Sequence, residues 1–328
     1  MLEHAAQRLR DTPVIDFGAV PGYGPIFNAG LIVVDGVFHL FARGVRDGYV
    51  SNEEPGPRFL DYVSDVLVFT SEDGLDYSFQ QVLATDSIDG LYSIEDPRVQ
   101  RISADGTEHV LMTYTYLSEP GSGKPWRVGV HRLVYADGRF AISPTWGRIV
   151  GPEGVPDKDC VLFNLRDGRL ALIHRIHPNM QLAVFDSLEH LYEANGDYWD
   201  AHLRELERHT LIRPALGGLG VGAGAPPIAA DGGLLLFYHE RDADSRYTIN
   251  VALLDDETGA LRSVLDRPIL RPELPWERNG DVDDVVFVQG AIGRPDGTIY
   301  LTYGAADRCV GVATIDAAPL IDALRSAC

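Results

Sequence analysis

Short apolar runs alternate with turns along the whole chain, and this pattern repeats. Five of the runs lie just after an Asp-Gly pair, where glycine supplies the positive φ that a tight hairpin turn requires. The pairs are Asp35-Gly36, Asp105-Gly106, Asp167-Gly168, Asp231-Gly232 and Asp296-Gly297. The intervals between their glycines are 70, 62, 64 and 65 residues, which indicates a structural repeat.

Each hairpin has a strand-like run before it and another after it. The runs before the turns are 31–34, 99–102, 161–163, 227–230 and 285–288. The runs after the hairpins are 65–70, 128–134, 181–185, 249–254 and 310–315. Five units of short strands, each about 65 residues long, are typical of a five-bladed β-propeller. We therefore predict an all-β fold in a single domain.

The repeat also sets the expected blade boundaries. The blades should span roughly 20–85, 86–150, 151–215, 216–275 and 276–316. A ring of blades must close, so we expect strands from the two ends of the chain to pair in the last blade. Helices are expected only at 188–206 and 317–327.

Polar residues recur at matching positions of the five units. In a propeller, such positions are neighbours around the central channel although they lie far apart in the sequence. The residues that open the inner strands are Asn28, Asp96, Lys158, Gly224 and Asp284. Those that end the next strands are Arg43, Tyr116, Arg175, His239 and Asp307. We expect the candidate site at the channel mouth where these positions meet.

Two adjacent carboxylates, Glu95 and Asp96, precede Pro97 in the second unit. Proline restricts the residue before it to extended geometry and has no N–H for a sheet ladder, so we expect a strand to begin here. Alternation along that strand would point the two carboxylates to opposite faces, with only one entering a shared cavity. A rigidly held acid suits general acid catalysis; the alternative is a carboxylate that pairs with Arg98 or caps a turn.

Charge and composition exclude several classes of partner. The net charge is −20, which opposes binding to nucleic acids and anionic membranes, so an anionic substrate would need a local cluster of cations. Three widely spaced cysteines indicate a reducing compartment. Neither a signal peptide nor a transmembrane run is recognisable, and the histidines lack metal-ligand spacing. We expect a cytoplasmic protein without a bound metal; the sequence is also compatible with a homo-oligomer.

Five short motifs carry a resemblance to a known family. They are Glu95-Asp96-Pro97-Arg98, His174-Arg175, the glycine-rich 222–228, Phe237-Tyr238-His239 and 303–307. In this order and spacing, over residues 20 to 316, the chain resembles glycoside hydrolase family 130. That family consists of five-bladed propellers that act on β-mannosides, most of them inverting phosphorylases and some hydrolases.

The resemblance implies a role for each matching residue. Asp96 would be the sole general acid, protonating the leaving oxygen through the 3-hydroxyl of the mannosyl unit. Inorganic phosphate would then attack from the opposite face and give α-mannose 1-phosphate, so phosphate is a co-substrate and no other cofactor is implied. Sugar-binding positions match Asn28, Arg43, Glu95 and Asp307. Their alternative interpretation is turn residues and a solvated arginine.

The phosphate-binding positions match only in part. Arg175 and His239 occupy family positions, whereas Lys158 stands where an arginine is usual and Gly220 where a lysine is usual. Lysine keeps the charge but loses the bidentate geometry of arginine. Two alternatives to a phosphorylase of small β-mannosides therefore remain open. One is a hydrolase of the same family, with Glu240 as a candidate base, and the other is a non-catalytic carbohydrate-binding propeller.

Overall fold

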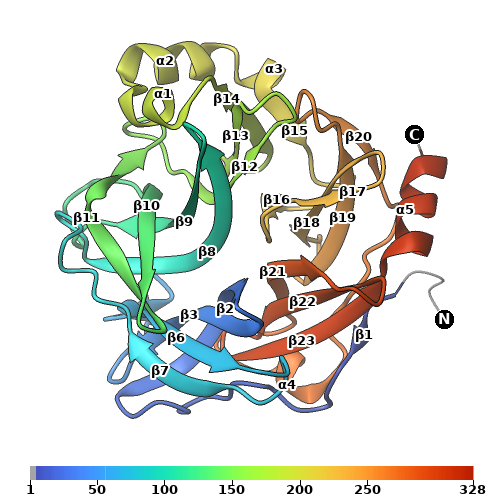
Figure 1. Cartoon of the computed structure of the whole chain (residues 1–328). Helices are drawn as coiled ribbons and strands as arrows, with labels where there is room; N and C mark the ends of the chain where they lie inside the picture. Colours follow the sequence, from blue (N-terminus) through green and yellow to red (C-terminus); the bar gives the residue numbers. More distant parts are fainter. Residues whose placement is uncertain (1–4, 56, 328) are drawn as a thin grey trace.

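The computed structural model describes residues 5–55 and 57–327 as five sheets arranged around a centre (Figure 1). The prediction of an all-β five-bladed propeller is thereby confirmed. Blade 1 contains β2 (Tyr23–Val34), β3 (Val37–Arg46), β6 (Ser64–Ser71) and β7 (Ser78–Val82). Blade 2 contains β8 (Ser93–Ala104), β9 (Thr107–Leu117), β10 (Arg127–Ala136) and β11 (Arg139–Val150). Blade 3 contains β12 (Lys158–Asn164), β13 (Leu170–Arg175), β14 (Met180–Phe185) and β15 (Thr210–Ile212).

The remaining two blades complete the ring. Blade 4 contains β16 (Gly220–Ala223), β17 (Ile228–Ala230), β18 (Gly233–Arg241), β19 (Tyr247–Leu254) and β20 (Leu261–Val264). Blade 5 contains β21 (Val286–Gly293), β22 (Thr298–Ala305), β23 (Cys309–Asp316) and β1 (Gln7–Arg8). A small hairpin of β4 (Val50–Ser51) and β5 (Phe59–Leu60) projects from the loop after β3. The hairpin turns form as the sequence requires: Asp35 and Gly36 both have positive φ, 51° and 82°.

The two ends of the chain meet in blade 5. Gln7 and Arg8 of β1 pair antiparallel with β23, and Arg8 also makes a buried ion pair. Its Nε and Nη2 each donate, at 2.8 Å, to Glu277, whose fully buried carboxylate belongs to α4 (Pro275–Arg278). Tyr303 Oη donates to the same carboxylate at 2.9 Å. The closing strand is thus held by backbone pairing and by an ion pair beneath it.

The helices that follow β14 and β23 lie outside the ring (Figure 1). The predicted helical segment at 188–206 divides into α1 (Leu188–Glu193), α2 (Gly196–Arg204) and α3 (Leu206–His209). It divides because Asn195 caps α2, its side chain accepting from Asp197 N. The other predicted helix is α5 (Ala317–Ser326), whereas α4 was not anticipated. In the described part of the chain, no helix has the length and apolar content needed to span a bilayer.

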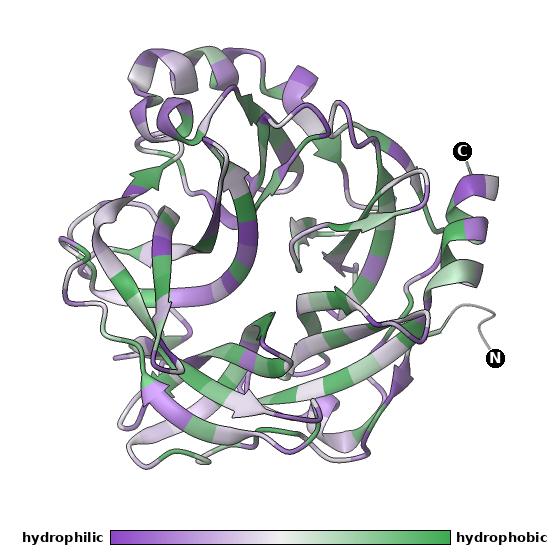
Figure 2. Ribbon diagram, viewed as in Figure 1, coloured by the Kyte–Doolittle hydropathy of each residue, from purple (hydrophilic) through white to green (hydrophobic). Residues whose placement is uncertain are grey.

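The core is divided among the contacts between neighbouring blades. Each of the five clusters of buried apolar residues joins two adjacent sheets. Tyr238 belongs to the cluster between blades 3 and 4, whereas the adjacent Phe237 belongs to the cluster between blades 4 and 5. Figure 2 shows apolar residues concentrated along the strands, with hydrophilic residues frequent in the outer helices and loops. Alternation along a strand therefore decides which neighbouring blade a side chain faces.

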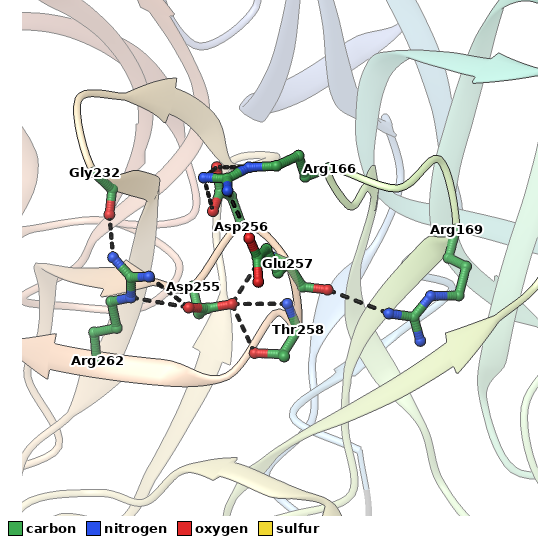
Figure 3. Close-up of polar contacts among 8 residues, drawn as sticks. All are labelled: Arg166, Arg169, Gly232, Asp255, Asp256, Glu257, Thr258 and Arg262. Atoms are coloured by element: carbon green, nitrogen blue, oxygen red, sulfur yellow. Dashed lines mark hydrogen bonds and ion pairs between the residues drawn. The ribbon is translucent and has the colours of Figure 1, made fainter.

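At the far end of blades 3 and 4 from the inner-strand starts, the hairpin turns are joined by ion pairs (Figure 3). Arg166, just after β12, donates to both carboxylate oxygens of Asp256 and to Glu257. Arg262 donates to Asp255 and to the carbonyl of Gly232. The two arginines and Glu257 are exposed while Asp255 and Asp256 are half-buried, so we expect the network to align the two turns without contributing much stability.

Candidate active site

A β-bulge interrupts the inner strand of blades 1, 2 and 3 at the same place. In each, two residues face one residue of the neighbouring strand. The first residue of each bulge has positive φ: 47° at Asn28, 51° at Asp96 and 51° at Asp159. Asparagine and aspartate adopt this left-handed conformation more readily than other non-glycine residues. The three bulges point polar side chains from different blades toward one another, and these side chains form one buried group.

Asp96 lies at the centre of this group, as the sequence suggested. The residue is 3% exposed, and Asn28 Nδ2 donates to Oδ1 at 2.8 Å. Arg43 Nη1 lies 3.6 Å from the same oxygen. Among the described residues, Oδ2 has no hydrogen-bond partner, which leaves it available to a substrate. The expectation that Pro97 holds Asp96 in extended geometry is wrong, because the bulge places Asp96 in the left-handed region.

Glu95 and Asp96 act on the same partner. Arg43 Nη2 donates to Glu95 Oε1, while Nη1 of the same guanidinium faces Asp96. The prediction that only one carboxylate would enter the site is therefore wrong: the extra residue of the bulge suspends the strand alternation. The Arg43 guanidinium also lies over the Phe27 and Tyr62 rings, 5.0 and 5.4 Å from their centroids. Arg43 is thus fixed by charge and by aromatic contact.

Asp307 follows β22 and lies in a turn, with φ 49°. Its side chain is half-buried, and burial raises its pKa to about 7. Arg43 and Lys158 oppose this rise, whereas Asp96 and Glu95 add to it. Because these charges act on its carboxyl group, Asp307 lies in the same site as Asn28, Arg43 and the two carboxylates.

A second group of charges surrounds Asp159, which sequence reasoning missed. Asp159 is 1% exposed; its Oδ2 lies 3.0 Å from Arg175 Nη1 and 3.4 Å from His239 Nε2. Burial alone would raise the pKa of Asp159, but Arg175, Lys158 and His239 hold it well below its ordinary value. Gly222 permits this approach, since a Cβ there would lie 2.4 Å from Asp159 and 2.5 Å from His239.

Polar atoms in this second group remain without partners. Among the described residues, both ring nitrogens of His239 and Arg175 Nε form no hydrogen bond, although the His239 ring is buried and stacks on Phe287 at 4.0 Å. Burial lowers the pKa of His239, and Asp159 only partly offsets this shift, so the imidazole is neutral near pH 7. Unpaired buried donors are costly, and an oxygen-rich anion would satisfy them.

Arg98 links the two groups across the channel. Its guanidinium is fully buried and donates to the carbonyls of Asp96 (3.0 Å), Ala223 (2.7 Å) and Gly224 (2.7 Å). Nη2 also lies 3.5 Å from Asp159 Oδ1. Arg98 therefore holds the inner strand of blade 2 against that of blade 4 and does not pair with the carboxylate of Asp96.

The structure also corrects which residue of blade 3 corresponds to Asp96 of blade 2. Lys158 pairs with Arg175, as Glu95 pairs with Thr115, so the residue equivalent to Asp96 is Asp159, not Lys158. Lys158 is half-buried, with Nζ 5.9 Å from the Trp126 ring centroid, and its charge influences both Asp159 and Asp307. The sequence contained the signal, because an aspartate precedes the apolar run in both blades.

Glu240 lies on the other face of its strand. His239 faces blade 5, whereas Glu240 Oε1 accepts from Ala215 N at 2.8 Å beside blade 3. There it lines a cavity of about 630 Å³ between blades 3 and 4. The structure thus brings together Asn28, Arg43, Glu95, Asp96, Lys158, Arg175, His239 and Asp307 but not Glu240. Among the described residues, no group of acidic, histidine and cysteine side chains is arranged to hold a metal ion.

Comparison with known proteins identifies the family. The model of glycoside hydrolase family 130, described as beta-1,4-mannooligosaccharide phosphorylase, matches residues 7–326. The chain belongs to glycoside hydrolase family 130. A 1,2-beta-oligomannan phosphorylase from Thermoanaerobacter sp. (strain X514) is 28% identical over 94% of this chain and 97% of that protein. A beta-1,2-mannobiose phosphorylase of the same organism is 32% identical over 89% and 90% of the two chains.

Solved structures of family 130 members share the fold. The beta-1,2-mannobiose phosphorylase from Listeria innocua, in complex with beta-1,2-mannobiose, superposes with a TM-score of 0.75 and 20% identity, covering 98% of this chain and 99% of that one. The mannose phosphorylase MPT-4 from Leishmania mexicana, in complex with phosphate, gives a TM-score of 0.67 with 18% identity over 97% and 91%. At these identities the likeness concerns the propeller architecture.

Proposed function

We propose that this family 130 member is an inverting phosphorylase that cleaves β-mannosidic bonds with inorganic phosphate. Asp96 serves as general acid, Arg175, Lys158 and His239 bind phosphate, and Asn28, Arg43, Glu95 and Asp307 bind the sugar. The products are α-mannose 1-phosphate and a mannoside shortened by one unit. Small β-mannosides and phosphate are the partners, and no metal takes part.

The observation that carries this proposal is the cation group around Asp159. Arg98, Arg175 and Lys158 outnumber the single carboxylate there, in a chain whose net charge is −20. Arg175 Nε and one ring nitrogen of the neutral His239 add hydrogen-bond donors without partners. A buried excess of positive charge with free donors suits a tetrahedral anion, because charge-assisted hydrogen bonds to phosphate are among the strongest in proteins. A water molecule, the nucleophile of a hydrolase, is uncharged and would need neither the positive charge nor the additional donors.

The proposed reaction uses the two sets of residues on either side of Arg98, the acid Asp96 with its neighbours and the cations around Asp159. A phosphate oxygen forms a bond to the anomeric carbon while the glycosidic C–O bond breaks. The proton of Asp96 passes through the 3-hydroxyl of the mannosyl unit to the leaving oxygen. An oxocarbenium-like transition state needs this protonation, and a positioned acid contributes about 10²–10⁴-fold. Holding phosphate in line with the breaking bond accelerates the reaction further, because the nucleophile is already oriented for attack.

The names of the relatives suggest which substrates to test first. Two relatives that align over most of this chain are named for β-1,2-linked mannosides, whereas the family description names β-1,4-linked ones. We therefore propose β-1,2-mannobiose as the first substrate and β-1,4-mannobiose as its comparison. A cytoplasmic location suits this reaction, since the charged sugar phosphate stays inside the cell.

Incubation of each disaccharide with the enzyme, with and without phosphate, tests the proposal. We expect α-mannose 1-phosphate to appear only with phosphate, and the reverse reaction to release phosphate from α-mannose 1-phosphate and an acceptor. Cleavage at full rate without phosphate, yielding free mannose, would establish hydrolysis instead.

Glu240→Gln provides a check on the hydrolytic alternative. Because Glu240 faces blade 3, we expect its neutral isostere to retain phosphorolysis within about 3-fold, the range of an indirect effect. A loss of about 100-fold in cleavage would instead make Glu240 a reacting group.

A further inference from the structure

We propose that His202, on helix α2, is a positioning residue for the phosphate-binding pair Lys158 and Arg175, acting through His174 and Asp157. The inference rests on the proposed function, because it gives the helical segment between β14 and β15 a part in phosphate binding. It concerns a buried chain of side chains behind the site, none of which touches the substrate.

The chain runs without interruption from α2 to the site strands. His202 Nε2 lies 3.1 Å from His174 Nε2, and His174 Nδ1 lies 2.9 Å from Asp157 Oδ2. The other oxygen of Asp157 accepts from the backbone N of Arg175 at 3.2 Å. Asp157 and His174 are fully buried and His202 is 3% exposed. Water therefore has little access with which to replace any of these contacts.

The chain ends at the backbone of both phosphate-binding residues. Asp157 directly precedes Lys158, and His174 directly precedes Arg175. Lys158 and Arg175 are also register partners across β12 and β13. A shift of Asp157 or His174 would thus move both cations at once. Gly151 allows the carboxylate its place: a Cβ there would lie 2.8 Å from Asp157 Oδ2.

Burial, followed by the neighbouring His174 and His209, lowers the pKa of His202 to about 3, so this ring is neutral at ordinary pH. His174 Nδ1 lies against a carboxylate oxygen, which accepts, so in the proposed arrangement this nitrogen donates to Asp157 Oδ2. Two ring nitrogens 3.1 Å apart can share one hydrogen bond, and in the proposed arrangement His202 Nε2 is its donor and His174 Nε2 its acceptor. The chain has one direction, from the helix toward the carboxylate, and His202 fixes the tautomer of His174.

Helix α2 holds His202 in place by ring packing. Trp199 meets the His174 and His202 rings edge-on, at centroid distances of 5.6 and 5.5 Å. His209 of α3 stacks on His202 at 4.1 Å. If His202 lost its donor, His174 Nε2 would become a buried acceptor without a partner, and protonation there instead would break the bond to Asp157. Either outcome releases the strand ends that carry Lys158 and Arg175.

Comparison of His202→Phe with His202→Gln tests the proposal, because glutamine can place an amide donor near the position of Nε2. We expect His202→Phe to raise the KM for phosphate about 10-fold, as a small misplacement of binding groups does, with the KM for the mannoside within about 2-fold. His202→Gln should recover most of the loss. His209→Phe, which keeps the ring stack and lies outside the hydrogen-bonded chain, is the control and should leave both constants unchanged.

A second readout needs no catalysis. In ¹⁵N-histidine NMR spectra of the wild type, His174 should appear as the Nδ1-protonated tautomer with a strongly downfield proton, lost in His202→Phe and regained in His202→Gln. The other tautomer in the wild type would overturn the proposal even if His202→Phe does not fold. An unchanged phosphate KM in a folded His202→Phe enzyme would also overturn it. Cleavage by the wild type without phosphate would instead defeat the proposed function.

Discussion

Arg98 Nη2 lies 3.5 Å from Asp159 Oδ1, at the point where the polar residues around Asp96 meet the cations around Asp159. The same guanidinium donates to the backbone carbonyl of Asp96, so a single buried side chain connects the two halves of the site. Arg98 binds three carbonyl groups and thereby fixes the spacing of the inner strands. Asp96, the proposed general acid, and the proposed phosphate-binding cations consequently keep their separation before any substrate enters.

Asp96→Asn should abolish acid catalysis without disturbing the fold. Asparagine tolerates the left-handed φ of the bulge and is nearly isosteric, so the melting temperature should change little. Turnover should fall about 10²-fold or more, as expected for loss of a positioned general acid. Steady-state kinetics and thermal unfolding of the same preparation check both parts. Near-normal turnover would remove Asp96 from the proposed mechanism.

Arg175→Ala should act on phosphate and not on the sugar. Arg175 is the cation nearest to Asp159, at 3.0 Å, and its Nε lacks a partner among the described residues. A charge-assisted hydrogen bond contributes about 1.5–3 kcal/mol, so the KM for phosphate should rise about 10-fold or more. Arg166→Ala, at the far end of the same blade, is a matched control and should alter neither constant (Figure 3). An equal rise in both KM values would contradict separate binding of the two substrates.

Asp307 should give the reaction a pH dependence near neutrality. Because its pKa is about 7, lowering the pH from 8 to 6 protonates the Asp307 carboxylate, which we propose accepts hydrogen bonds from sugar hydroxyl groups. We expect kcat/KM for the mannoside to fall over that interval at saturating phosphate. In Asp307→Asn the inflection should disappear from a profile that is lower throughout. An inflection that persists unchanged in the variant would belong to another group or to phosphate itself.

The same pKa predicts a stability difference of definite sign. The folded protein holds the Asp307 proton up to about pH 7, whereas an unfolded aspartate releases it near pH 4. Between these values the native state binds more protons, so this contribution to the free energy of unfolding decreases as the pH rises. Urea unfolding of wild type and Asp307→Asn at pH 5 and pH 8 should show the wild type losing more stability.

Arg8→Ala should loosen the closure of the ring. Glu277 is fully buried, and removal of Arg8 leaves its charge without the bidentate partner. Breaking one side of a buried ion pair costs about 3–5 kcal/mol. Urea unfolding should show this loss, and adding Glu277→Gln should restore part of it by removing the unpaired charge. A change below about 1 kcal/mol would mean that backbone pairing of β1 alone closes the blade.

The repeat in the sequence was sufficient to predict the propeller and the group of residues at its mouth. Arg175 ends its strand, Arg43 and His239 lie two or three residues before the ends of theirs, and Asp307 follows β22; the Asp-Gly turns located all four strands well. Their side chains meet because the ring brings equivalent strand ends together. Helix α4 escaped notice since its four residues carry no periodic signal.

What the sequence concealed was the bulge. An extra residue in a strand changes the register without a characteristic composition, so Lys158 took the place of Asp159 and Glu95 was assigned to the opposite face from Asp96. Pro97 strengthened that error by favouring extended geometry for the residue before it. The position of Glu240, in contrast, was predictable, because it adjoins His239 in a regular strand.

The three bulges limit which amino acids can serve in this site at all. A residue at position 28, 96 or 159 must adopt a φ near +50°, which costs most side chains about 1–2 kcal/mol and suits asparagine, aspartate and glycine. A longer acid such as glutamate at position 96 would incur that cost and also displace its carboxylate. The catalytic repertoire of the channel mouth is therefore narrowed by backbone conformation before chemistry selects among the residues that remain. Attempts to redesign the enzyme have more freedom at the strand ends, such as positions 43 and 175, than at the bulges.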